Sequence, residues 1–152
     1  MGDYEAIVIG GGHAGIEAAL ALARLGSNCL LITQNPDTIG KMSCNPAIGG
    51  LAKGNLVREI DALGGQMGIL ADASALQLRM LNQSRGAAVQ APRAQSDKAL
   101  YAQLARKSLE EQANLSILMD TVVDLIPSRD GRRIEGVFTE RGAAIGAKVV
   151  VL

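Results

Sequence analysis

Six residues near the amino terminus constrain the fold more than any other part of the chain. Residues 10–15 read Gly-Gly-Gly-His-Ala-Gly and match the pattern G-x-G-x-x-G. The apolar run at residues 6–9 precedes them and predicts a strand buried on both faces. Apolar residues at helical spacing follow and predict a helix whose buried stripe is Ile16, Ala19, Leu20 and Ala23. A strand, a glycine turn and a helix in this order are typical of doubly wound α/β folds.

Each glycine of the turn has a predicted role. Gly10 permits the tight turn, Gly12 lets a pyrophosphate approach the backbone, and Gly15 lets the helix pack close to the strand. The N–H groups and the dipole at the start of the helix favour phosphate. His13 is interpreted as a turn residue beside the phosphates and not as a catalytic base, because no carboxylate is near it in sequence. The predicted dinucleotide site consists of Gly10, Gly11, Gly12, His13, Ala14 and Gly15.

One part of this fingerprint is missing after the second predicted strand, residues 29–32. An acidic residue that would hold a ribose hydroxyl is expected about 20 residues after the glycines. The chain has Thr33, Gln34 and Asn35 there instead. These side chains would bind ribose less strongly than a carboxylate. The motif therefore predicts a dinucleotide without indicating which one.

Composition excludes several classes of protein. The 152 residues suit one domain, 48% of them are apolar, and the formal net charge is zero. These values argue against a disordered tail and against a globally basic nucleic-acid binder. Residues 79–107 nevertheless contain six basic residues and one acid. This segment either meets phosphates of a nucleotide or nucleic acid, or is simply a solvated surface.

The two cysteines, Cys29 and Cys44, are too few for a disulfide framework. Cys29 lies in the second apolar run, where a buried free thiol is expected, and this usage favours a reducing compartment. The sequence shows no signal peptide and no apolar run of about 20 residues. We therefore expect a cytoplasmic protein without a membrane segment. No metal site is predicted.

The middle of the chain gives weaker signals. A helix is predicted at about residues 53–63, with Leu56, Ile60 and Leu63 on its buried face and Gly64 at its end. Residues 73–81 are ambiguous between strand and helix, and residues 82–95 are interpreted as an ordered loop. Ser96 is the predicted cap of a helix that runs to about residue 112.

From residue 116 the pattern changes to short strands. A parallel core strand is followed by a three-stranded meander with turns at Asp130-Gly131 and Arg141-Gly142, and by a return to the core. Flavoproteins of the glutathione-reductase type have such a meander in place of the second crossover helix. We therefore predict an α/β, Rossmann-like FAD-binding fold, with a parallel sheet, helices and a three-stranded β-meander crossover.

Four segments resemble one known family. They are IVIGGGHAGIEAAL at residues 7–20, MSCNPAIGG at 42–50, KGNLVREIDALGG at 53–65 and RAQSDKALY at 93–101. The chain resembles the N-terminal part of the tRNA uridine 5-carboxymethylaminomethyl modification enzymes, also called MnmG or glucose-inhibited division protein A. Residues 1–152 would then be the N-terminal portion of an FAD-binding domain. The rest of that domain, an NAD-binding insertion and a C-terminal helical region would be absent.

The resemblance implies an activity, cofactors and partners. Members of the family bind FAD, use NADH as reductant and are homodimers. Together with the partner GTPase MnmE, they add an aminomethyl-type group to C5 of the wobble uridine, position 34, of certain tRNAs. The resemblance places the FAD phosphates on Gly10 to Gly15, and it places adenine against the backbone of Val122. Thr33 and Asn45 are the further cofactor-binding candidates.

The resemblance also gives a context for Cys44, the candidate catalytic residue. Its loop would pass beside the flavin, held in shape by Asn45-Pro46 and Gly49-Gly50. The thiol would be a nucleophile toward C6 of uridine, a redox partner of the flavin, or only a packing group beside the ring. Two other functions stay open at this level. One is a generic FAD or NAD oxidoreductase acting on a small molecule, and the other is an inactive nucleotide-binding fragment.

Overall fold

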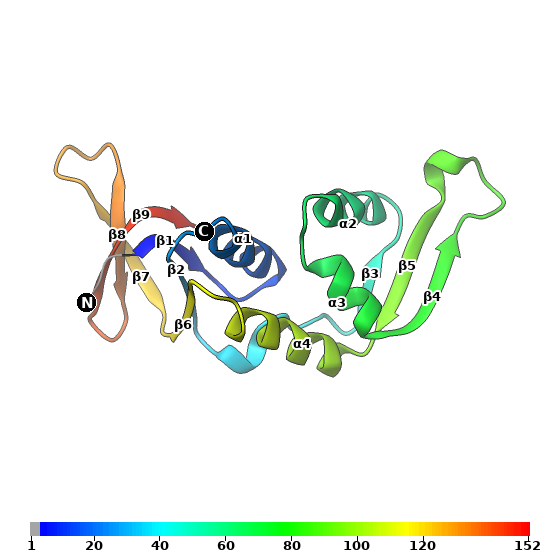
Figure 1. Cartoon of the computed structure of the whole chain (residues 1–152), viewed down its shortest axis with the longest axis horizontal. Helices are drawn as coiled ribbons and strands as arrows, with labels where there is room; N and C mark the ends of the chain where they lie inside the picture. Colours follow the sequence, from blue (N-terminus) through cyan, green and yellow to red (C-terminus); the bar gives the residue numbers. More distant parts are fainter. Residues whose placement is uncertain (1–3) are drawn as a thin grey trace. The chain divides into compact units, whose positions relative to one another are not determined.

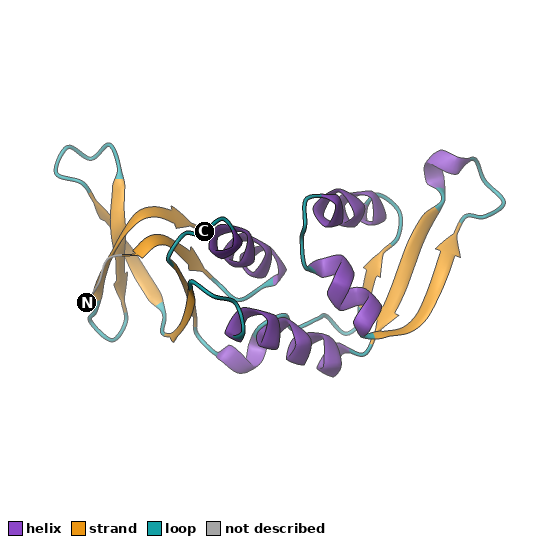
Figure 2. Ribbon diagram, in the orientation of Figure 1, coloured by secondary structure: helices purple, strands orange, loops and turns teal. Residues whose placement is uncertain are grey.

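The computed structural model describes residues 4–152, which form two compact units. Unit 1 consists of Met1–Ile39 and Arg106–Leu152, and unit 2 consists of Gly40–Ala105. Each unit combines its own β-sheet with helices, as Figure 2 shows. The chain is therefore of mixed α/β class, as predicted.

Unit 1 is built on a six-stranded sheet with the strand order β6-β2-β1-β9-β8-β7 (Figure 1). The strands β6, β2, β1 and β9 are parallel, whereas β9, β8 and β7 form an antiparallel meander. The helix α1, His13–Arg24, joins β1 to β2 and packs against both. The strand bounds are β1 Tyr4–Ile9, β2 Cys29–Thr33, β6 Leu115–Met119, β7 Val122–Pro127, β8 Ile134–Thr139 and β9 Ala144–Val151.

A single strand, β9, ends the meander and returns the chain to the core. Its first part pairs antiparallel with β8, where Gly146 faces Gly136. Its second part pairs parallel with β1, beginning where Ala147 faces Tyr4. The predicted meander is confirmed, and its third strand is also the predicted core strand. This places β1 between β2 and β9, at the point where the strand order reverses.

The core of unit 1 confirms the predictions for its first half. The four residues of the predicted α1 stripe are all buried. Gly26 follows the helix with φ +91° and donates its N–H to the Ala23 carbonyl, as a C-terminal glycine should. Cys29 is fully buried in β2, and burial raises the pKa of its thiol to about 11. Its thiolate is therefore disfavoured at neutral pH.

Unit 2 contains a three-stranded antiparallel sheet with the order β3-β5-β4. The helices α2 and α3 pack on one of its faces, where side chains of Ile48, Leu78 and Ala94 meet them around a small pocket. The helix α4, Lys98–Glu110, follows β5. The other bounds are β3 Ala47–Gly49, α2 Lys53–Ala62, α3 Met67–Ala73, β4 Ala75–Leu81 and β5 Ala91–Ser96, with single 3-10 turns at Pro36–Thr38 in unit 1 and Ala87–Val89 in unit 2.

The predicted buried face of α2 is wrong. Leu56 and Leu63 are 58% and 90% exposed. The helix instead turns Gly54 and Val57 toward the sheet. A Cβ built on Gly54 would lie 3.4 Å from the Pro92 carbonyl oxygen, which is an ordinary packing distance, so this part of α2 lies in direct contact with β5. Apolar spacing alone therefore did not predict which face of α2 contacts the sheet.

Two further predictions in unit 2 are wrong. Residues 82–95 were expected to be a loop, but Ala91–Ser96 is the central strand of the sheet. Its polar sequence is stabilised by ladders on both sides. The cap of α4 is Asp97 and not Ser96, because Asp97 Oδ1 accepts from the N–H groups of Ala99 and Leu100 at 2.9 and 3.1 Å. The buried Ser96 hydroxyl has no hydrogen-bond partner among the described residues.

Candidate dinucleotide site and the Cys44 loop

The glycine turn between β1 and α1 has the geometry that its sequence predicts. Gly10 has φ +101°, and its N–H donates to the Ile32 carbonyl at 2.8 Å. A Cβ on Gly15 would overlap the Gly10 carbonyl oxygen, so α1 reaches the turn only because residue 15 is glycine. Gly11 is equally confined, since a Cβ there would lie 2.8 Å from Ile39 Cγ1. These three glycines shape the turn itself.

Gly12 differs from Gly11 and Gly15 because a side chain built on it would face open space. It is exposed, and a Cβ built on it meets no atom of residues 4–152 within 4 Å. Gly12 is also the N-cap of α1 and has no side chain to cap that helix end. Ala14, in the first turn, is exposed as well. This helix terminus therefore offers its dipole and backbone to an anion that approaches over Gly12.

His13 is the first residue of α1 and is half-buried. Burial lowers its pKa below the ordinary value of 6.5, and the nearby Glu17 carboxylate opposes this shift without cancelling it. The imidazole is therefore mainly neutral at pH 7. A neutral imidazole can also accept a proton, so this charge state does not decide between a turn residue and a base. Glu17, four residues on, is a nearby carboxylate that the sequence interpretation overlooked.

A pocket of about 260 Å³ lies at the carboxyl ends of β1, β2 and β6, beside the start of β7. It brings together Gly10, Thr33 and Val122, three of the predicted cofactor-binding residues. In open parallel sheets, ligands bind at this end of the strands, where the strand order reverses. The other lining residues are Ile9, Ile32, Gln34, Thr38, Asp120 and Thr121.

Asp120 is a buried residue of this pocket that the sequence reasoning missed. Its Oδ1 accepts from the Thr121 N–H at 2.8 Å, and its own N–H donates to the Thr33 carbonyl at 3.1 Å. Burial raises its pKa, but the Thr121 amide, the Thr139 hydroxyl and Arg141 together hold the pKa below its usual value. Asp120 thus fixes the β6–β7 junction, and with it Val122. Its position just after an apolar core strand was the available signal.

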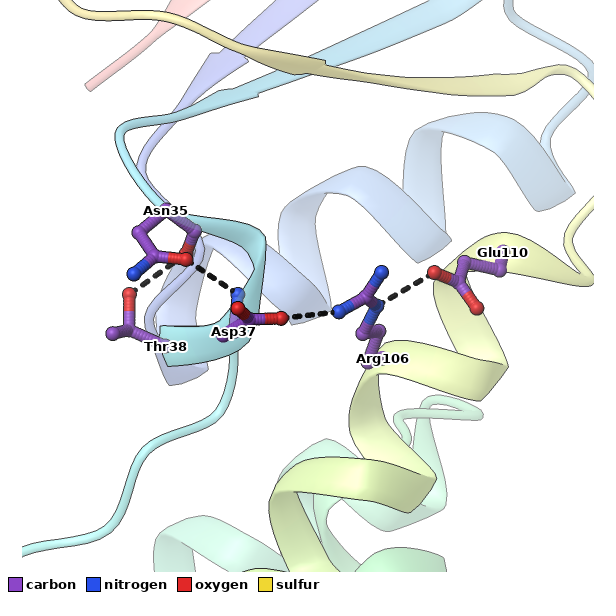
Figure 3. Close-up of polar contacts among 5 residues, drawn as sticks. All are labelled: Asn35, Asp37, Thr38, Arg106 and Glu110. Carbon is purple, nitrogen blue, oxygen red and sulfur yellow. Dashed lines mark hydrogen bonds and ion pairs between the residues drawn. The ribbon is translucent and has the colours of Figure 1, made fainter.

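The third ribose candidate, Asn35, is occupied in the turn that follows β2. Its Oδ1 accepts from the Asp37 N–H and its carbonyl accepts from the Thr38 hydroxyl, both at 2.8 Å. Figure 3 shows that Arg106 of α4 bridges Asp37 and Glu110, at 2.7 and 2.6 Å. Thr33 and Gln34 are therefore the remaining ribose candidates at the pocket. Arg106, one of the basic residues of segment 79–107, already has two carboxylate partners.

The Cys44 loop, residues 42–50, belongs to unit 2. Cys44 is exposed and its thiol is free. Asn45 restrains the loop: its carbonyl accepts from the Ala47 N–H at 2.9 Å and from the Ser43 hydroxyl at 3.3 Å, and its Oδ1 accepts from Arg93 at 3.4 Å. Gly49 has φ +95°, and a Cβ there would overlap the Pro92 carbonyl oxygen. The loop thus holds an accessible thiol on a constrained backbone.

Comparison with known proteins identifies the family. Residues 5–152 match the family described as glucose inhibited division protein A. The chain belongs to the glucose inhibited division protein A family. The predicted resemblance is therefore confirmed.

The relatives in this family are much longer than the chain. It is 65% identical over 150 residues to the tRNA uridine 5-carboxymethylaminomethyl modification enzyme MnmG of Borreliella burgdorferi (strain ZS7), covering 99% of the chain and 24% of that protein. The corresponding enzyme of Treponema denticola is 57% identical over 157 residues, covering 99% of the chain and 25% of that protein. The form I crystal structure of Aquifex aeolicus GidA matches with a TM-score of 0.94 and 52% identity, over 98% of the chain and 24% of that chain. The chain thus spans about a quarter of the length of these relatives.

Within residues 4–152, no three or more His, Cys, Asp or Glu side chains are grouped so that they could hold a metal ion. In the same residues, no helix combines the length and apolar character needed to cross a membrane.

Proposed function

We propose that unit 1 binds the adenosine diphosphate part of FAD, in an enzyme that modifies the wobble uridine of tRNA. One observation carries this proposal. The N-terminus of α1 begins at Gly12, where open space would admit a phosphate, and Gly10 of the same turn lines a pocket together with Thr33 and Val122. Family membership supplies the class of reaction, since the named relatives are tRNA uridine modification enzymes.

The described residues suit the parts of FAD in different ways. The backbone from Gly10 to Gly15 and the α1 dipole would hold the pyrophosphate. Thr33, with Gln34 beside it, would bind ribose, and the backbone of Val122 would contact adenine. Asn45 would contact the cofactor from its own loop. FAD, when bound, supplies two-electron redox chemistry, with NADH as the proposed reductant.

Cys44 is the proposed catalytic residue. Its thiolate would add to C6 of the target uridine, which raises the electron density at C5. After C5 has gained its substituent and lost its proton, elimination breaks the S–C6 bond and restores the thiolate. The exposed thiol on a restrained loop supports this role. The proposal includes the partner GTPase MnmE, a homodimeric enzyme and a cytoplasmic location.

The basic segment supports tRNA as the substrate. Arg79, Arg85, Arg93 and Lys98 lie in unit 2 and have no ion pair among the described residues. Arg106 and Lys107, in contrast, pair with carboxylates of α4 and its surroundings. Within segment 79–107, the four cations without a described ion pair therefore all lie in unit 2.

An absorbance spectrum and a modification assay test the proposal. The intact protein, purified without added cofactor, should show flavin absorbance, and it should modify wobble uridine in tRNA when NADH and the MnmE-type GTPase are supplied. Bound nicotinamide without flavin would point instead to a dehydrogenase. A folded protein with neither flavin nor modification activity would contradict the proposed function.

A further inference from the structure

Two arginines face each other directly across the sheet of unit 2. The register of β4 and β5 pairs Arg79 with Arg93. Successive side chains along a strand point to opposite faces. Leu78 and Ala94 lie on the face that α2 and α3 cover, so Arg79 and Arg93 lie on the opposite face. The next pair on that opposite face is Gln77 with Gln95.

This arrangement brings positive charges together without a described counter-charge. Like charges directly opposite each other on an antiparallel pair are destabilising. Among residues 4–152, no carboxylate forms an ion pair with either arginine. The described side-chain partner of Arg93 is the neutral Asn45 Oδ1, at 3.4 Å. The face therefore presents two guanidinium groups and two amides, which suits an anion.

We infer that Arg79 and Arg93 together bind one phosphodiester of the tRNA backbone, an inference that rests on the proposed function. Guanidinium groups match phosphate oxygens in a planar, bidentate geometry. Arg79 is exposed on an open ribbon, which suits a polymer lying across it better than a small enclosed anion. The exposed cations Arg85 and Lys98 of the same unit extend the electrostatic field around it.

The same pair is connected to the candidate catalytic loop. Arg93 donates to Asn45, the residue next to Cys44. A phosphate held by Arg93 would therefore sit close to the segment that carries the thiol. Arg93 is in this sense a positioning residue, which sets where the bound nucleotide lies relative to Cys44.

The test measures tRNA affinity of the intact flavin-loaded protein over a range of salt concentrations. The variants are Arg79→Gln, Arg93→Gln and the double substitution, with exposed Arg129→Gln in the β7–β8 hairpin of unit 1 as the matched control. Each single substitution should weaken binding several-fold and reduce the salt slope by about one. The double variant should lose less than the sum of the singles, because both arginines hold one phosphate.

Two additional readouts separate a failure of this inference from a failure of the proposed function. Flavin content should stay at the wild-type value in Arg79→Gln and Arg129→Gln, because neither arginine has a described hydrogen bond to a proposed FAD residue. Arg93→Gln removes the hydrogen bond to Asn45, so its tRNA affinity is compared at matched flavin content. If the wild type binds no tRNA, oligouridylate is used as the probe instead of tRNA. A weaker affinity of the variants for oligouridylate would then still support the site. Affinities and salt slopes equal to those of Arg129→Gln would overturn the inference. The inference would also be overturned if inorganic phosphate stabilised the wild type but not the variants while the variants kept the tRNA affinity of the wild type.

Discussion

At the scale of single residues, the two thiols of the chain lie in opposite environments. Cys29 is buried in β2 with a raised pKa, whereas Cys44 is exposed on a restrained loop. Only Cys44 is therefore placed to react with a substrate.

Replacing Cys44 with serine tests its catalytic role. Serine has nearly the same size, so Cys44→Ser should keep the fold and the bound flavin. Wobble-uridine modification should fall by about two or more orders of magnitude if the thiol is a covalent catalyst. Assays at matched flavin content measure this. Iodoacetamide labelling of the native protein is the control and should mark Cys44 but not Cys29. Turnover within a few-fold of wild type would mean that Cys44 only packs in its loop and takes no part in the chemistry.

Gly12 and Gly15 provide a matched pair of substitutions in the phosphate turn. Gly12 has φ −75° and open space beside it, so Gly12→Val should fold normally and lose flavin, because the side chain fills the phosphate approach. Gly15→Ala should destabilise the protein even without flavin, because its Cβ meets the Gly10 carbonyl. Flavin absorbance and thermal unfolding measure both effects. Normal flavin content in folded Gly12→Val would refute the placement of the pyrophosphate.

At the scale of elements, the helices and junctions depend on particular caps. The start of α4 offers a direct comparison between neighbouring residues. Asp97→Ala removes the acceptor for two helix N–H groups and should cost about 1 kcal/mol in the free energy of unfolding. Ser96→Ala removes a buried hydroxyl without a partner and should be neutral or slightly stabilising. Urea unfolding measures both. A larger loss for Ser96→Ala would restore serine as the cap.

The β6–β7 junction should respond to acid through Asp120. Because the folded-state pKa of Asp120 is lowered, its charged form stabilises the protein above the unfolded pKa of about 3.9, and this contribution disappears as pH falls through the folded value. Asp120→Asn keeps an acceptor for the Thr121 amide but not the charge facing Arg141. The variant should therefore show a flatter decline of melting temperature below about pH 4. Identical acid profiles for variant and wild type would contradict this role.

At the scale of the whole molecule, ADP should protect one of the two units and not the other. ADP lacks the flavin, so in hydrogen exchange it should protect amides of the glycine turn and the β6–β7 junction in unit 1. It should leave Gly40–Ala105 unchanged. Protection of unit 2 by ADP alone would contradict this division of roles.

Most of unit 1 could be predicted from short segments of the sequence. Its strands, the stripe of α1, the glycine turn and the meander follow from signals within short segments: buried apolar runs, helical spacing, and glycine where φ is positive or a Cβ would collide. Gly10 and Thr33 were predicted near the cofactor from the glycine motif and its missing carboxylate, whereas Val122 was expected from the family resemblance alone. The structure lines one pocket with all three residues.

Other features depend on contacts between segments that are distant in sequence, and these features became visible only in the three-dimensional structure. The polar strand β5 exists because β3 and β4 supply ladders on both sides, and Gly54 of α2 faces inward in contact with the backbone of Pro92. Asp120 becomes part of the pocket through hydrogen bonds across the β6–β7 junction. The opposition of Arg79 and Arg93 follows from strand register alone. Such features are set by pairing and close packing between segments, and local periodicity carries no signal for them.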